Sequence, residues 1–220
     1  MQLQAAIVPP PSVVQDALAA ARTIHLKPEA PQEKPGPVER LFQRRSEPAA
    51  PAASLTVVAS EEAFVRVARL GNVTPEDARI LARALDQFAA AWPAPVVHVA
   101  ELGIELSDTQ LVIKAQLGGD TDGLRSIFDQ FNDAAKAQRF FLDRRSFRPE
   151  FFVASLDLPG DPSFLDRLDW EAEAHRGPDW QVTAVSLMRA NFGDNAPTFH
   201  EVETLALGVD PTDGARTTGS

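Results

Sequence analysis

The sequence predicts an α+β protein whose sheets are mainly antiparallel. Strand-like segments follow one another in pairs with short turns between them, as in "PVVHVAELGIEL" and "TQLVIKAQL", and such pairs are typical of β-hairpins. Segments with a helical spacing of apolar residues separate groups of strands instead of alternating with single strands, which disfavours a doubly wound parallel sheet. A chain of 220 residues with 44% hydrophobic residues is long enough to bury a sizeable core.

The composition disfavours several classes of function. The chain has 31 acidic and 21 basic residues and a net charge of −10, so non-specific attraction to nucleic acid or to an anionic membrane is disfavoured. It has no cysteine, which excludes disulfides and thiolate metal sites. No apolar run approaches the roughly 20 residues of a membrane-spanning helix, and no flavin, nicotinamide or metal motif occurs. We therefore expect a cytoplasmic protein without a metal or a cofactor.

The sequence of the N-terminal part predicts a strand over 3–8. A helix is expected to follow, which begins after an N-cap at Ser12 and continues to residue 25. A proline-rich insertion over 26–54 follows, because its frequent prolines sustain neither a helix nor a central strand. Within it, Leu41 and Phe42 form an apolar pair in "PVERLFQRR". A long loop usually packs on its own domain, but this pair is also the candidate site for a protein partner.

The next elements are strands over 55–58 and 64–70 and a helix that ends near Trp92. Thr74 is the expected N-cap of this helix and Pro75 its first residue. The apolar stripe that we expect it to bury consists of Ile80, Leu81, Ala84, Leu85 and Phe88.

The remaining part of the chain is expected to end in a hairpin of two long strands. The predicted elements, in order, are strands over 95–106 and 109–117, a helix over 121–137, a strand over 147–158, a short helix over 164–172, strands over 180–192 and 198–207, and a flexible tail over 210–220.

One segment, "VVASEEAFVRVARLGNVTPEDARILARAL", resembles the first motif region of the 2H phosphoesterases, the group of 2′-5′ RNA ligase-like and RNA 2′,3′-cyclic phosphodiesterase proteins. In that family a strand carrying His-x-Thr is followed by Leu-Gly, an acidic turn and a helix. Here Leu70-Gly71, followed by Thr74-Pro75, matches this order.

The family then repeats the plan with a strand that carries Arg-Pro-His-x-Thr. Arg148-Pro149 in "RRSFRPEFFVASL" matches the Arg-Pro pair. The resemblance implies a single bilobal domain over residues 1–209, with two pseudo-symmetric lobes of mainly antiparallel sheet, helices packed outside and a central cleft.

Neither His-x-Thr motif is present in this sequence. Aligned on the Leu-Gly and Arg-Pro pairs, the first motif falls on Phe64 and Arg66, and the second falls on Glu150 and Phe152. In the family, the two histidines act as general base and general acid on a phosphodiester, and phenylalanine cannot transfer a proton. The histidines of this chain lie outside any motif that would replace them: His25, His98, His175 and His200.

The resemblance therefore implies a non-catalytic binding or scaffold module in which the cleft is retained. If a nucleotide or an RNA end still binds there, the candidate phosphate contacts are Arg66, Arg144, Arg145 and Arg148.

The alternative is a divergent hydrolase of cyclic or RNA phosphodiesters, in which Glu150 is the general base and Arg66 binds the phosphate. In the non-catalytic case we expect Arg66 and Glu150 to form an ion pair within about 4 Å, between Phe64 and Phe152. A third interpretation is an unrelated α+β fold. Convergence of these four side chains on one cleft would distinguish the 2H-like fold from it.

Overall fold

The computed structural model places the strands in two main antiparallel sheets. It describes residues 1–26, 55–57, 62–106, 110–142, 146–157, 168–169, 175–192 and 197–208. The elements are β1 (Gln2–Ile7), α1 (Pro11–Ala21), β2 (His25–Leu26), β3 (Leu55–Val57), β4 (Val65–Asn72), α2 (Pro75–Ala89), β5 (Val96–Leu106), β6 (Gln110–Gly119), α3 (Thr121–Ala137), β7 (Glu150–Asp157), β8 (Leu168–Asp169), β9 (Trp180–Gln181), β10 (Ala184–Asn191) and β11 (Thr198–Ala206).

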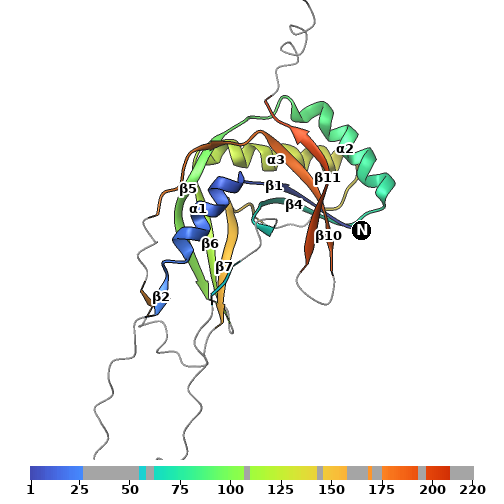
Figure 1. Ribbon diagram of the computed structural model, residues 1–220. Helices are drawn as coiled ribbons and strands as arrows, with labels where there is room; N and C mark the ends of the chain where they lie inside the picture. The colour runs from blue at the N-terminus through green and yellow to red at the C-terminus, as the bar shows by residue number, and fades with distance from the viewer. Residues whose placement is uncertain are drawn as a thin grey trace, which may run out of the picture.

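The four-stranded sheet has the order β11-β10-β1-β4 and the five-stranded sheet the order β3-β7-β6-β5-β9. All the pairings are antiparallel, and β5 with β6 and β10 with β11 form the predicted hairpins. The helices α2 and α3 pack against the four-stranded sheet through β11 and β4, whereas α1 packs against β5 and β7 of the five-stranded sheet (Figure 1). The predicted α+β fold with antiparallel sheets and outer helices is confirmed.

The helices α2 and α3 begin where local chemistry satisfies their free backbone N–H groups. At α2 the hydroxyl of Thr74 accepts a hydrogen bond from the backbone N–H of Asp77 at 3.1 Å, and proline occupies the first turn. At α3 the carboxylate of Asp120 accepts from the N–H of Gly123 at 2.8 Å. Both helices therefore begin where the sequence predicts.

The buried face of α2 is rotated around the helix from the predicted one. Ile80 and Phe88 are 47% and 50% exposed, whereas Leu81 and Leu85 are fully buried. The helix packs on the sheet through Leu81, Leu85 and three alanines, so Ile80 and Phe88 of the predicted stripe remain at the surface.

The strand β1 lies between β10 and β4 and is buried on both of its faces. Leu3, Ala5 and Ile7 belong to the main core, together with residues of all three helices. Gln4 and Ala6 point to the other face, because successive side chains of a strand alternate. Opposite these two residues on β4 lie Arg69 and Arg66, which line the cleft described below.

Two segments differ from the sequence-based expectation. The first helix begins at Pro11 without a side-chain cap and ends at Ala21, and His25–Leu26 forms a short strand instead of the helix end. Its partner is Leu168–Asp169, where a short helix was expected. Helices of this length are marginal unless packing supports them, and here pairing satisfies the backbone instead.

Several predictions lie outside the described residues. They include the insertion over 27–54 with Leu41 and Phe42, and the tail over 210–220. In the described part of the chain, none of the helices combines the length and the apolar character needed to cross a membrane.

Candidate functional site

The four motif positions lie around one cleft. Its volume is about 860 Å³, and residues of both main sheets line it, among them Phe64, Arg66, Glu150 and Phe152. The first two precede or belong to β4 and the last two belong to β7. The expected convergence of these side chains on a single cleft is confirmed.

A second arginine of β4 also faces the cleft. Arg66 lies opposite Ala6 of β1 and Arg69 lies opposite Gln4, with a register shift between the two pairs. This irregularity inserts one extra residue into β4, so side chains three positions apart share a face. Both arginines are exposed and line the cleft. Strict alternation along β4 would place Arg69 on the face opposite to Arg66, so the sequence pattern does not reveal that it lines the cleft.

Phe64, at the first histidine position, belongs to a small apolar cluster. Its ring packs edge-on against Phe199 of β11, with centroids 4.9 Å apart and an interplanar angle of 76°. Ala6 and Met188 complete the cluster, and Phe64 is 7% exposed. An apolar ring contact therefore occupies this position, which the sequence resemblance aligns with the first histidine of the family.

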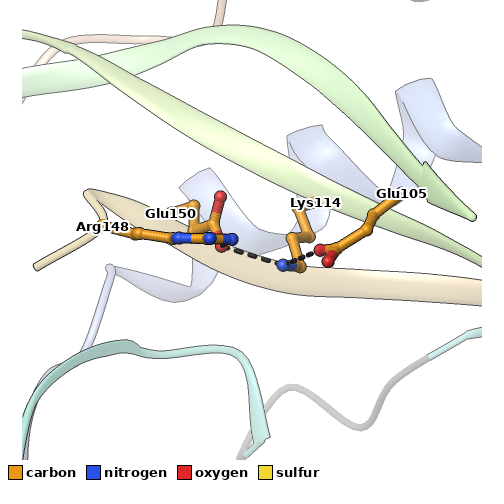
Figure 2. Close-up of polar contacts among 4 residues, drawn as sticks. All are labelled: Glu105, Lys114, Arg148 and Glu150. Atoms are coloured by element: carbon orange, nitrogen blue, oxygen red, sulfur yellow. Dashed lines mark hydrogen bonds and ion pairs between the residues drawn. The ribbon is translucent and has the colours of Figure 1, made fainter. Parts of the chain in front are cut away.

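Glu150, at the second histidine position, belongs to a charged network on the five-stranded sheet. Its carboxylate accepts a hydrogen bond from the ammonium of Lys114 at 2.9 Å, and the guanidinium of Arg148 lies 3.9 Å away. The same ammonium donates to Glu105, as Figure 2 shows. We call Glu105, Lys114, Arg148 and Glu150 the charge network.

The predicted pairing of Glu150 with Arg66 is therefore wrong, since the ion pairs that the structure gives to Glu150 are with Lys114 and Arg148. Lys114 lies on β6, next to β7, where it pairs with Phe152 in the ladder. It is thus a diagonal neighbour of Glu150 on the same sheet, whereas Arg66 belongs to the other sheet. The charge of Lys114 within the apolar run "LVIKAQL" was the available sequence signal.

The charge network shifts the pKa of two of its members. Burial acts to lower the pKa of Lys114, but hydrogen bonds and charge from Glu105 and Glu150 outweigh it, and the pKa is raised above its ordinary value. The hydrogen bond and the charge of Lys114 lower the pKa of Glu105. Lys114 is therefore a fixed cation between carboxylates, unsuited to proton transfer near neutral pH.

A smaller polar hollow of about 200 Å³ shares the charge network with the cleft. Its other side includes Gly103 on β5 and Gln116 on β6. A Cβ atom at position 103 would lie 2.5 Å from the amide nitrogen of Gln116, so glycine leaves the space that this side chain occupies. The five-stranded sheet thus presents a polar surface to the cleft.

The histidines take no part in lining this cleft in the described part of the chain. His98 contacts Asp179 at 3.1 Å, and His175 contacts Asp16 of α1 at 2.7 Å. His200 is exposed on β11. Among the residues that the structure describes, no group of three or more His, Asp or Glu side chains could hold a metal ion.

Of the four arginines predicted to contact phosphate, two can be placed. Arg66 and Arg148 line the cleft from opposite sheets. Arg144 and Arg145 lie outside the described residues.

Two antiparallel sheets that enclose a cleft, with helices outside, are the arrangement that the 2H phosphoesterase resemblance implied. No protein-family model matches the chain, and no curated protein matches it. Solved structures do: TT0787 of Thermus thermophilus is 18% identical, with a TM-score of 0.57 over 94% of this chain and 98% of that one.

E. coli LigT is similar in the same way. Its complex with 3′-AMP is 13% identical, with a TM-score of 0.57 over 94% of this chain and 97% of that one. Its complex with NADP+ is 13% identical, with a TM-score of 0.56 over 94% and 98% of the two chains. The chain therefore has the LigT-like 2H phosphoesterase fold.

Proposed function

We propose that this protein is a non-catalytic, 2H phosphoesterase-like binding module that holds a phosphorylated nucleoside or an RNA end in its cleft. One observation carries the proposal: the motif positions meet in the cleft, yet none of them is a histidine and one of them, Arg66 on β4, is an arginine. Arginine binds phosphate through its planar set of N–H donors. At its motif positions the cleft thus has an arginine for binding a phosphate but no pair of histidines for proton transfer.

The solved structures support the choice of ligand. LigT has been crystallised with 3′-AMP and with NADP+, which both carry a phosphorylated nucleoside. The aromatic rings of Phe64, Phe152 and Phe199 line the cleft of this chain, and aromatic side chains offer a surface for a nucleobase.

The charge network argues against the alternative hydrolase. The carboxylate of Glu150 is already engaged by Lys114 and, more loosely, by Arg148. To accept a proton from a nucleophile, Glu150 would first have to leave these contacts. Lys114 keeps its proton, so it does not supply the general acid that would complement Glu150.

Calorimetric titration with 3′-AMP tests the proposal. We expect binding by the wild-type protein and a weakening of about tenfold to a hundredfold in Arg66→Ala, because a hydrogen-bonded charge on the phosphate is lost. Arg83→Ala is the matched control, since Arg83 is an exposed arginine of α2 that does not line the cleft. Equal affinity of Arg66→Ala and the wild type, or no binding by either, would refute the proposal.

A scaffold role for the insertion over 26–54, with Leu41 and Phe42 as the contact for a protein partner, stays a prediction from the sequence. A location in the cytoplasm also stays a prediction.

A further inference from the structure

The face of the four-stranded sheet that is turned to the cleft carries a buried amide whose nitrogen has no partner. Gln4 and Ser186 are the two buried polar side chains of the described residues, each 5% exposed. The hydroxyl of Ser186 donates to Glu201 at 2.6 Å. The amide nitrogen of Gln4, in contrast, has no hydrogen-bond partner among the described residues. A buried donor without an acceptor is costly, so it calls for an explanation.

The strand register places this amide beside the arginines of the cleft. Gln4 lies directly opposite Arg69, and Ala6 lies directly opposite Arg66. Cross-strand partners point to the same face of a sheet, so Gln4 belongs to the face from which Arg66 and Arg69 line the cleft. Positions 4 and 6 are two residues apart, which separates the two arginine positions by about 7 Å.

Arg69 is available as a second anion contact. It is exposed, and the ion pairs that the structure gives for the described residues do not include it. The other cross-strand neighbour of Gln4 is Met188. Met188 is buried in the cluster of Phe64, so Arg69 is the neighbour whose long exposed side chain can move aside to let an acceptor reach the amide.

We infer that Gln4 and Arg69 form a second subsite, which takes a second phosphate of the ligand about 7 Å from the phosphate bound at Arg66. This inference rests on the proposed function. The chemistry of the subsite fits an anionic, oxygen-rich group, because a guanidinium and an amide N–H both donate to phosphate oxygens. The ligand class is therefore a nucleoside whose sugar carries two phosphates at different positions, such as a bisphosphorylated nucleoside or the internal unit of an oligonucleotide.

A matched pair of probes tests the subsite: 3′-AMP, with one phosphate, and adenosine 3′,5′-bisphosphate, with two. We expect the wild-type protein to bind the bisphosphate about tenfold or more tightly than 3′-AMP. In Arg69→Ala and in Gln4→Met, most of this preference should disappear while the affinity for 3′-AMP stays within about twofold. The controls Gln2→Met, on the same strand, and Arg83→Ala should keep the preference.

A thermal unfolding measurement on the same variants separates a binding role of Gln4 from a structural one. Gln4→Met replaces an unsatisfied buried donor by an apolar side chain of similar size, so we expect it to raise Tm while it weakens bisphosphate binding. An unchanged preference in both Gln4→Met and Arg69→Ala, or no preference in the wild type, would overturn the subsite. In those cases binding of 3′-AMP that depends on Arg66 would leave the proposed function standing. If 3′-AMP itself does not bind, the proposed function and the subsite both fail.

Discussion

At the scale of single residues, two motif positions of the cleft are occupied by side chains that contact other side chains of the protein. Phe64 is held by Phe199 in an apolar contact, and Glu150 is held by Lys114 in a charged one. Each position is thus occupied by a side chain with neighbours of its own, which stabilise it in the absence of a ligand. The structure of the cleft therefore does not depend on a substrate to neutralise a buried charge.

The charge network makes a prediction about stability. Lys114 and Glu150 are each 23% exposed, so Lys114→Met leaves a mostly buried carboxylate without its main partner. We expect the free energy of unfolding to fall by about 1 to 2 kcal/mol in urea titrations at neutral pH. Lys136→Met is the control, because Lys136 pairs with Asp133 at the surface and should change stability by at most about 0.5 kcal/mol.

The pH dependence of the stability difference between wild type and Lys114→Met follows from the shifted pKa values of Lys114 and Glu105. The pKa of Lys114 is raised in the folded protein, so its contribution is complete below its ordinary value near 10.5 and is lost as the pH rises through the raised value. The pKa of Glu105 is lowered, so its contribution is present above its ordinary value near 4.5 and is lost as the pH falls through the lowered value. The stability difference between wild type and Lys114→Met should therefore be flat between these limits and shrink outside them. A difference that varied steeply near pH 7 would contradict the assignment.

At the scale of elements, β4 connects the sequence pattern to the site. Near the end of β4, next to a register shift of the β1–β4 ladder, Gly71 has φ +70°, in the left-handed region that glycine adopts without strain. The following N-cap at Thr74 starts α2, so the strand and the helix are fixed by adjacent local signals. These signals were readable from the sequence because each of them depends on neighbours in the chain.

Replacing Gly71 tests how far this turn stabilises the motif strand. A Cβ atom there would meet no other atom within 4 Å, so Gly71→Ala should cost only the backbone strain, about 1 to 2 kcal/mol in chemical denaturation. Gly71→Asn should recover part of the loss, because asparagine tolerates the left-handed region better than alanine does. If alanine were as stable as glycine, the left-handed turn would not be a constraint on the fold.

Other parts of the site could not be predicted, because they depend on register between distant strands. Arg69 reaches the cleft only through the irregularity of the β1–β4 ladder. Lys114 reaches Glu150 only because β6 and β7 are adjacent. Ile80 and Phe88 show the same limit on α2, since apolar spacing predicts an apolar helix face but not which residues at its edges the sheet covers.

At the scale of the whole molecule, the fold is the LigT-like 2H phosphoesterase fold, and the resemblance in the sequence predicted it correctly. Both main sheets contribute to the cleft, and one continuous core contains residues of β1, of β6 and of all three helices. The cleft therefore lies on a continuously packed core.

The most direct test of this account is a phosphorus NMR measurement of adenosine 2′,3′-cyclic phosphate with the purified protein, from about pH 4 to pH 9. The account predicts that the signal of the cyclic phosphate shifts or broadens through binding that depends on Arg66, and that no monophosphate product appears. The appearance of a ring-opened monophosphate that is abolished in Glu150→Gln would contradict it and would establish a divergent hydrolase.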